Sequence, residues 1–374
     1  MKWSWRMGKF AGVDVYIHAT FALLLGWVGV SHWLMGRSVD AAAGGIAFIL
    51  ALFACVLLHE FGHALAARRY GITTRDITLL PIGGLARLER MPEKPWQELW
   101  VALAGPAVNV VIAAGLYVCL RLTTYWTPVA ELSVASGPFL ERLLMANVSL
   151  VIFNLIPAFP MDGGRVLRAL LAMHMDFAKA TRTAASLGQG LAFVLGFVGL
   201  LTNPFLTFVA LFVWISAGQE ANSVQMKSAL SGTPIHAAML TDFRVLSKSD
   251  QLSHAAKLLL SGSQQDFPVM ERNQVVGIVT TTDLLTALAE HGEDHSVATM
   301  MRTDFATAES SETLETIFER LHEHDCRTVP VFHNGQLVGL VTMENLAEYL
   351  LIQAALSRNG SSRSAPPALV PARG

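Results

Sequence analysis

Two histidines and a glutamate with metal-site spacing occur in His59-Glu60-Phe61-Gly62-His63. On a helix, His59 and His63 lie on one face, one turn apart, so their imidazoles are placed to bind one Zn²⁺. Glu60 projects from another part of the helix and is free to act on a water molecule beside the metal. The spacing therefore predicts a zinc hydrolase in which Glu60 is the general base for zinc-activated water.

A hydrolytic zinc site needs three protein ligands and one open position. Asp162 is the only acidic residue in the stretch 143–175. Two prolines that break a helix precede it, and two glycines that allow a sharp turn follow it. We expect Asp162 to be the third ligand. The alternative is that Asp162 caps a helix that begins near Arg165.

The elements that carry these residues have the composition of a membrane protein. The 374-residue chain is 52% hydrophobic and only 15% charged, whereas ordinary soluble domains carry about 25% charge. Runs without Asp, Glu, Lys or Arg cover 15–36, 41–59, 99–120, 143–161 and 183–219. The last run is long enough for two spans separated at Asn203-Pro204, so we expect six transmembrane helices.

The basic residues predict how the chain is oriented. Lys and Arg are concentrated before the first span and after the second and fourth spans. By the positive-inside rule, both termini and everything after residue 222 are cytoplasmic. The first apolar run is too long for the core of a signal peptide, so we expect it to anchor the chain. The net charge of −2 gives no indication of a nucleic-acid partner.

With these motifs, the chain resembles the site-2 protease family of intramembrane zinc metalloproteases over residues 1–222. The motifs are His59-Glu60-x-x-His63, Asn154…Pro157…Asp162-Gly163, Ala104-Gly105-Pro106-x-x-Asn109, Val15-Tyr16-Ile17-His18 and Pro81-x-Gly83-Gly84. The resemblance implies a prokaryotic cytoplasmic-membrane enzyme that cleaves transmembrane segments or membrane-anchored regulators, such as anti-sigma factors and sigma-factor precursors. It also implies that Asn154 donates a hydrogen bond to the substrate or the oxyanion.

Three features of residues 1–222 each allow two interpretations. Asn109 is either a site residue or a partner for backbone groups freed by Pro106. His18 is either a site residue or a hydrogen-bonded interior histidine. Residues 75–89 are apolar and strand-like, and form either an edge that accepts an unwound substrate as an added strand or an ordinary interfacial hairpin.

An internal repeat follows within residues 233–352. The run from Phe267 to Leu284 returns 62 positions later, and each copy reads strand, helix, strand, strand, helix. This part resembles a pair of CBS domains, with repeats at 233–290 and 295–352. We therefore expect a polytopic α-helical membrane domain with a small interfacial hairpin (1–222), a linker (223–232), a soluble α+β CBS pair and a disordered tail (353–374).

The resemblance implies an adenine nucleotide such as ATP in the cleft of the CBS pair. In the motif Gly-x-Val-Thr-x-x-Asp, Thr280 and Asp283 would contact the nucleotide, the carboxylate at its ribose hydroxyls. Thr342 matches in the second repeat, but Asn345 replaces the acid. The module would gate catalysis only through a nucleotide affinity that differs between two states. The alternatives are a purely structural module and one that forms a homodimer.

Two other functions are compatible with parts of the sequence. A channel or transporter regulated by CBS domains accounts for the spans and the repeat but gives no reason for the histidine pair. A different membrane zinc peptidase would use a glutamate as the third ligand, which the setting of Asp162 disfavours.

Overall fold

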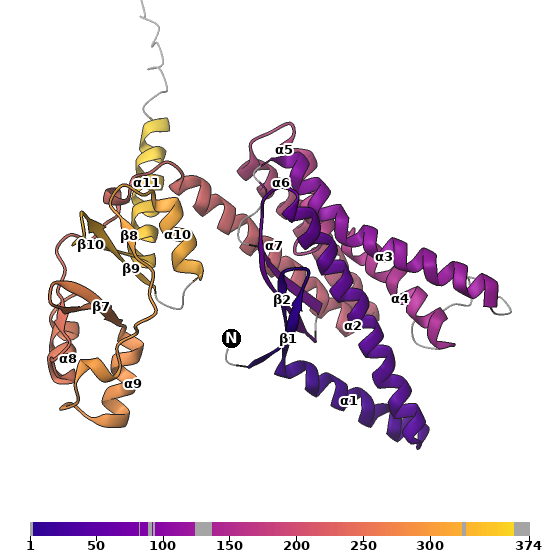
Figure 1. Ribbon diagram of the computed structural model, residues 1–374. Coiled ribbons are helices and arrows are strands. Elements are labelled where there is room, and N and C mark those ends of the chain that lie inside the picture. The colour runs from indigo at the N-terminus through magenta and orange to yellow at the C-terminus, as the bar shows by residue number, and fades with distance from the viewer. Residues whose placement is uncertain are drawn as a thin grey trace, which may run out of the picture. The chain divides into compact units, whose positions relative to one another are not determined.

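The computed structural model describes residues 3–81, 83–88, 92, 94–123, 137–323 and 327–362. The chain divides into two compact units, Met1–Ser223 and Val224–Gly374 (Figure 1). The first unit contains long apolar helices and one sheet, and the second contains the repeated strands and helices.

The sheet of the first unit has four strands in the order β1-β2-β3-β4. They are β1 (Ser4–Phe10), β2 (Val13–His18), β3 (Thr74–Leu80) and β4 (Gly83–Leu88). β2 and β3 pair in parallel through the buried residues Val15 and Ile77, and the other neighbours are antiparallel. The strand-like segment expected at 75–89 thus forms β3 and the edge strand β4.

The first apolar helix begins later than the expected span 15–36. The alternating, β-branched sequence Val13–His18 forms β2, and α1 (Ala19–Gly36) starts only after it. His18 is the N-cap of α1, because its Nδ1 accepts a hydrogen bond from the Thr20 N–H at 3.3 Å. This hydrogen bond gives His18 a capping role at the start of α1.

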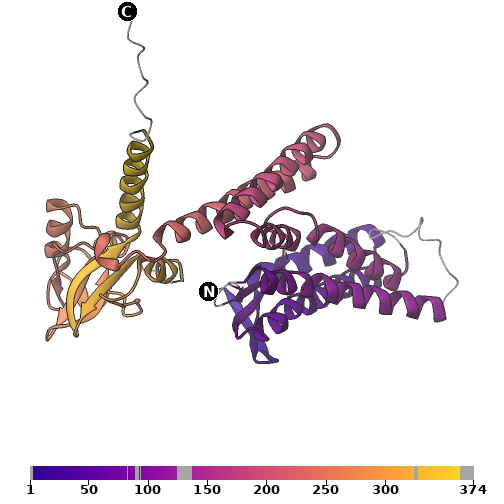
Figure 2. The same cartoon turned by 90° about the horizontal axis from the view of Figure 1, so that it is seen from above.

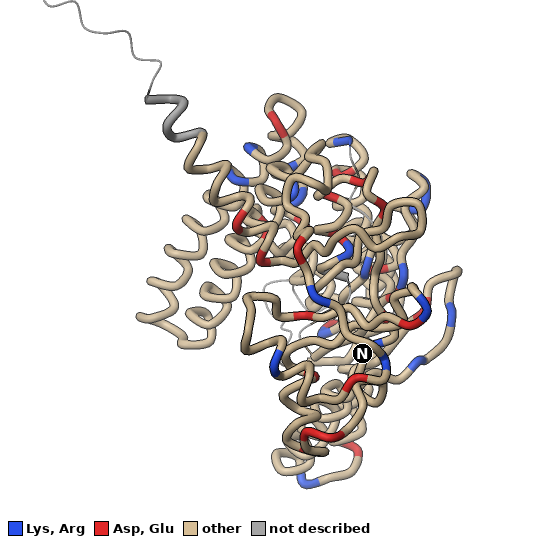
Figure 3. Tube along the Cα trace, turned by 90° about the vertical axis from the view of Figure 1, so that its left-hand side faces the viewer, with Lys and Arg blue, Asp and Glu red and all other residues tan. Residues whose placement is uncertain are grey.

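Five helices of the described residues are long and apolar enough to cross a membrane. They are α1, α2 (Val39–Arg68), α3 (Pro95–Thr123), α6 (Phe177–Thr202) and α7 (Pro204–Leu230). Long stretches of the trace carry no charged residue (Figure 3). As expected, Asn203 separates α6 from α7, and the two helices lie side by side (Figures 1 and 2). These helices identify a multi-pass membrane protein.

The expected fourth span, 143–161, is not one continuous helix. α4 (Phe139–Asn154) has 16 residues and ends before the prolines, and α5 (Asp162–Ala172) starts after a short turn. A helix of this length is shorter than the ~20 residues that a perpendicular crossing needs. The six-span count therefore stays a prediction, with five candidate spans in the described part of the chain.

The second unit repeats one arrangement of strands and helices. Its two sheets contain β5 (Leu246–Ser247), β6 (Phe267–Glu271) and β7 (Gln274–Val279), and β8 (Ala308–Glu309), β9 (Thr328–His333) and β10 (Gln336–Thr342). The helices are α8 (Leu252–Ser261), α9 (Thr281–His291), α10 (Leu314–Glu323) and α11 (Met343–Ser362), with short 3-10 turns at Ile235–Ala237 and Val297–Thr299.

The register of the two sheets confirms the repeat. Val269 lies opposite Gly277 in the first sheet, and Val331 lies opposite Gly339 in the second. The start of each repeat pairs with the other repeat, since Leu240 bonds to Leu340 and Arg302 bonds to Ile278. The repeats therefore exchange their first segments and form one interlocked body.

The ends of the second unit differ from the expected linker and tail. α7 runs on through the expected linker to Leu230, which is buried in the core of the second repeat. α11 continues ten residues beyond the expected end of the repeat, to Ser362. The expectation of disorder from residue 353 is therefore wrong for 353–362, and the remainder, 363–374, lies outside the described residues.

Candidate metal centre

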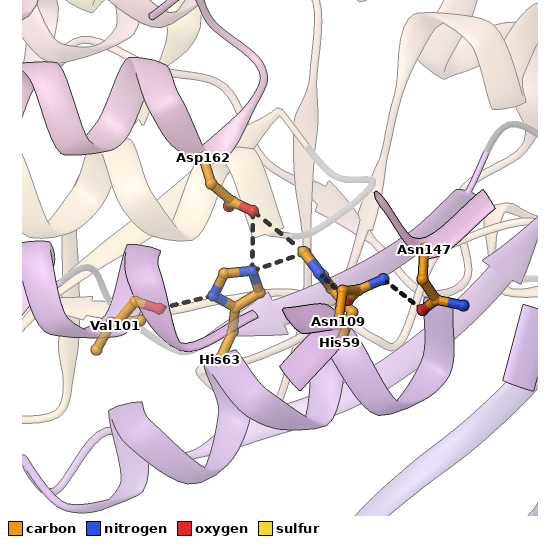
Figure 4. A network of polar contacts seen from close by, with 6 residues as sticks. All are labelled: His59, His63, Val101, Asn109, Asn147 and Asp162. Carbon is orange, nitrogen blue, oxygen red and sulfur yellow. Dashed lines mark hydrogen bonds and ion pairs between the residues drawn. The ribbon is translucent and has the colours of Figure 1, made fainter. Parts of the chain in front are cut away.

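Two helices bring the three expected metal ligands together. His59 and His63 lie one turn apart on α2, and Asp162 is the first residue of α5 (Figure 4). The two Nε2 atoms are 3.1 Å apart, and each lies 3.2 Å from Asp162 Oδ2. All three residues are buried. Among the described residues, His59, His63 and Asp162 form a group whose ligand atoms are close enough together to hold one metal ion.

The outer nitrogen of each imidazole has an oxygen partner. The Val101 carbonyl accepts a hydrogen bond from His63 Nδ1 at 2.7 Å, so the Nε2 of His63 presents a lone pair. The Nδ1 of His59 lies 2.8 Å from Asn109 Oδ1 in the same manner. Two nitrogen lone pairs and a carboxylate oxygen repel one another at these distances unless a cation lies among them. The donor set fits Zn²⁺, which takes histidine nitrogen and carboxylate oxygen.

Gly105 on α3 leaves room for the two imidazoles. A Cβ atom at this position would lie 2.2 Å from His63 Nε2 and 2.7 Å from His59 Nε2. No side chain is compatible with these distances unless the imidazoles move. The sequence identified Gly105 only as part of a family-like motif, because the approach of α3 to α2 is a tertiary contact.

The glycines after Asp162 serve close packing rather than a sharp turn. Neither Gly163 nor Gly164 has a positive φ, and both lie in the first turn of α5. A Cβ on Gly163 would lie 2.2 Å from the Ile156 carbonyl oxygen, and one on Gly164 would lie 2.6 Å from the Ala158 carbonyl carbon. The two glycines therefore let α5 start tightly against the preceding turn, which places Asp162 at the histidines.

Glu60 lies against the edge strand of the sheet. An added Cβ at Gly84 of β4 would be 2.6 Å from Glu60 Cγ and 3.0 Å from its Oε1. The carboxylate thus follows His59 in sequence and lies over the face of β4, the last strand of the sheet among the described residues. By contrast, Asn154 is the partly exposed last residue of α4, and among the described residues it has no hydrogen bond to the cluster or to Glu60.

Two buried asparagines extend the cluster away from the metal position. Asn109 contacts His59, so it belongs to the site rather than to the backbone freed by Pro106. Asn147 on α4 contacts Asn109 in turn, at 3.2 Å between its Oδ1 and the Asn109 Nδ2. Asn147 was not among the residues predicted from the sequence, although a polar side chain within an apolar span is a usable signal.

Thr280 and Asp283, the two residues expected to bind a nucleotide, contact each other, and Asp283 also contacts Arg302. Thr280 caps α9 and donates to Asp283 Oδ2 at 2.6 Å. Arg302 donates to both carboxylate oxygens, at 2.5 Å and 3.0 Å. Although burial raises the pKa of Asp283, the hydrogen bonds from Arg302 and Thr280 outweigh it and leave this pKa below its ordinary value. In the second repeat, Thr342 and Asn345 form the same cap without the acid.

Comparisons with known proteins identify the families to which the two parts of the chain are similar. The model of peptidase family M50 matches residues 47–134 and 125–197, and that of the CBS domain matches 235–290 and 297–352. A zinc metalloprotease of Methanocaldococcus jannaschii is 30% identical over 354 residues, which cover 94% of this chain and 97% of the relative. The stage IV sporulation protein FB of Bacillus subtilis is 27% identical over 49% of this chain and 61% of its own length.

A solved structure was also similar. The site-2 protease from Methanocaldococcus jannaschii is 37% identical, with a TM-score of 0.44, and covers 59% of this chain and 95% of that chain. The family models and the relative that matches over nearly its full length show that the chain is a membrane zinc metalloprotease with a CBS domain pair. It belongs to peptidase family M50, the site-2 proteases, which confirms the expected resemblance and enzyme class over the channel or transporter.

Proposed function

We propose that this protein hydrolyses peptide bonds of membrane-spanning or membrane-anchored proteins, with zinc held by His59, His63 and Asp162. The observation that carries the proposal is the buried convergence of two imidazole lone pairs and one carboxylate oxygen within 3.2 Å of one another. Such a set supplies three ligands and leaves a fourth position open for the reaction. Regulators of the anti-sigma-factor or sigma-factor-precursor type are the substrate class that the family resemblance favours.

The side chains around the cluster have separate roles in this mechanism. When bound, Zn²⁺ supplies a Lewis acid that makes a water molecule more acidic and polarises the scissile carbonyl. Glu60 accepts the proton of the attacking water and delivers it to the nitrogen of the leaving peptide. Asn154 donates a hydrogen bond to the substrate carbonyl once the substrate lies at the end of α4.

The edge strand β4 offers a way to present the substrate. Because a helical peptide bond is covered by its own hydrogen bonds, the substrate must unwind before attack. β4 is the last strand of the sheet, and Gly84 brings its backbone to the Glu60 side chain. A substrate that pairs with the open side of β4 is then extended and lies next to the general base.

Cleavage of a membrane-anchored substrate by the purified full-length protein tests this function. We expect Glu60→Gln to retain zinc and to lose at least about 100-fold in kcat, because a general base contributes roughly 10²–10⁴-fold. We expect a chelator to abolish cleavage in the unaltered protein and added zinc to restore it. Full activity of Glu60→Gln would contradict the proposal.

The strand-addition step has its own test with a matched control at the opposite edge of the sheet. Ala86→Pro in β4 should retain zinc and lose cleavage, because proline interrupts the pairing edge. Met7→Pro lies at the irregular position of β1, the other edge strand, and should keep both properties. Unchanged cleavage by Ala86→Pro would exclude substrate pairing on β4.

For the second unit we propose an adenine nucleotide as the ligand, bound through Thr280 and Asp283. Arg302 occupies both oxygens of Asp283, so the nucleotide must compete with this arginine for the carboxylate. We also propose that this ligand gates cleavage and that both termini lie on the cytoplasmic side, where Lys and Arg are concentrated. Equal cleavage rates with and without ATP, at a concentration that saturates the CBS pair, would exclude gating.

A further inference from the structure

A chain of buried side-chain amides connects His59 to a backbone carbonyl on another helix. His59 Nδ1 lies 2.8 Å from Asn109 Oδ1, and Asn109 Nδ2 lies 3.2 Å from Asn147 Oδ1. Asn147 Nδ2 in turn donates to the Leu143 carbonyl at 2.9 Å and to Cys55 Sγ at 3.4 Å. Asn109 and Asn147 are both fully buried. Figure 4 shows the two amides in line behind His59, on the side away from Asp162.

The chemistry of each group fixes the direction of this chain. A backbone carbonyl only accepts, so Asn147 must turn its Nδ2 toward Leu143 and its Oδ1 toward Asn109. An amide oxygen also only accepts, so Asn109 must turn its Nδ2 toward Asn147. The Oδ1 of Asn109 then faces His59, whose Nδ1 must carry the proton. The Nε2 of His59 is consequently left with a free lone pair at the metal position.

Both histidines therefore carry the proton on Nδ1, but a different kind of partner fixes this tautomer in each. His63 donates directly to the Val101 carbonyl, and a backbone carbonyl has no second orientation. His59 faces an amide whose oxygen and nitrogen exchange places on rotation by half a turn. Without a second contact, Asn109 would be free to present its NH₂ group, which requires the opposite tautomer of His59.

We propose that Asn147 is a positioning residue of the metal centre, which fixes the orientation of Asn109 and through it the zinc-binding tautomer of His59. This inference rests on the proposed function, because it takes the Nε2 of His59 as a zinc ligand. Asn147 contacts neither the metal position nor the substrate position. Its hydrogen bonds reach His59 through Asn109, and its other side-chain partner, Cys55, lies one turn before His59 on α2.

Zinc affinity of the full-length protein, measured by competition with a chelator, tests the proposal. Loss of a histidine's outer hydrogen-bond partner typically weakens metal binding about 10–100-fold. We expect a loss in this range for Asn109→Leu and a loss of about 10-fold for Asn147→Leu. The double variant should bind zinc no more weakly than Asn109→Leu alone. Independent losses that multiply in the double variant would overturn the proposal.

A conservative substitution separates positioning from a general structural role. In Asn109→Asp, both side-chain oxygens are acceptors, so neither orientation of the side chain is wrong for His59. The Asn147 Oδ1, which faces residue 109, would then meet an acceptor in place of a donor, so we expect Asn147→Leu to cause no further loss of zinc affinity in the Asn109→Asp background. A structural defect at residue 147 would persist in that background, and such persistence would contradict the proposal. Thr181→Val is a matched control, because this buried hydroxyl donates to the Phe177 carbonyl of its own helix.

The tautomer of His59 in the unaltered protein is a readout that does not depend on the stability of a variant. In zinc-free protein with ¹⁵N-labelled histidine, both His59 and His63 should carry the proton on Nδ1. Asn147→Leu should add the Nε2–H form at His59 and leave His63 unchanged. A His59 that carries no proton on Nδ1 in the unaltered protein would overturn the inference. Failure of the unaltered protein to bind zinc would instead overturn the proposed function.

Discussion

Gly105 faces the imidazoles of His59 and His63 with a hydrogen atom where any other residue has a carbon. Gly105→Ala would place a Cβ 2.2 Å from His63 Nε2, so the imidazoles must move out of the metal position. We expect zinc affinity to fall at least ~10-fold, as for a disturbed histidine orientation. Gly115→Ala on the same helix is the control, because an added Cβ meets nothing within 4 Å there. Equal zinc content in the two variants would contradict this account of Gly105.

Gly84 on β4 faces Glu60 as Gly105 faces the two histidines, and it lies on the strand where we propose that the substrate pairs. The Cβ of Gly84→Ala would lie 2.6 Å from Glu60 Cγ, so the carboxylate must leave its place while the metal ligands remain. We expect zinc to stay bound at the level of the unaltered protein and kcat to fall about 10-fold or more, since the general base is displaced. Zinc analysis and cleavage rates of the same preparation distinguish this result from a loss of metal.

The sequence alone could predict the site residues whose roles follow from their spacing along the chain. His59 and His63 share a helix face by periodicity, and Asp162 is the only carboxylate near the end of the later apolar run. Asn147 and Gly105 could not be assigned in this way. Their roles depend on where α3 and α4 lie against α2, and this packing leaves no periodic signal in the chain.

At the scale of elements, a buried arginine joins three helices around the centre. Arg168 on α5 pairs with Glu98 on α3 and with Glu220 on α7, and its guanidinium lies over the rings of Phe159 and Phe177. Only 1% of the Arg168 side chain is exposed. The ion pairs therefore hold the helix that carries Asp162 against the helix that contacts His63.

Removal of this arginine should destabilise the helix bundle. In Arg168→Met, the carboxylate of Glu98 is left buried without its partner, which typically costs about 3–5 kcal/mol. We expect a lower thermal midpoint in detergent. The double variant Arg168→Met with Glu98→Leu should recover part of the loss, because no unpaired charge then remains on α3. A double variant less stable than Arg168→Met would contradict this interpretation.

Element boundaries could be predicted only where composition changes sharply. The turn at Asn203 follows from its local sequence, whereas the start of α1 does not, because residues 15–18 of β2 continue the uncharged run of the helix that follows. The same reason explains the fourth expected span. Residues 143–161 form one apolar run, but prolines within it end α4 and make room for the turn before Asp162.

At the scale of the whole molecule, the two CBS repeats interlock, and the exchange brings Arg302 from the start of the second repeat to Asp283 in the first. The sequence revealed the repeat through its 62-residue offset but not this contact, because the contact depends on the pairing of Arg302 with Ile278, which is tertiary structure. The two repeats also differ in charge at equivalent positions, with Asp283 in the first repeat and Asn345 in the second.

This difference predicts a single nucleotide site in the pair. We expect Asp283→Ala to weaken ATP binding at least ~10-fold, since a carboxylate that accepts from hydroxyls contributes about 1.5–3 kcal/mol. Asn345→Ala at the equivalent position should leave the affinity unchanged. Isothermal titration calorimetry of the full-length protein measures both. The reverse order of effects would place the ligand in the second repeat.

We propose that one Zn²⁺ is bound by His59 and His63 of α2 and Asp162 of α5. X-ray absorption at the zinc edge of the purified full-length protein measures it directly. We predict one zinc per chain, with two imidazole nitrogens at about 2.0–2.1 Å and a carboxylate oxygen at about 2.0–2.2 Å. The imidazole contribution should disappear in His59→Ala with His63→Ala. Sulfur in the first coordination sphere, or an unchanged spectrum in that double variant, would contradict the account.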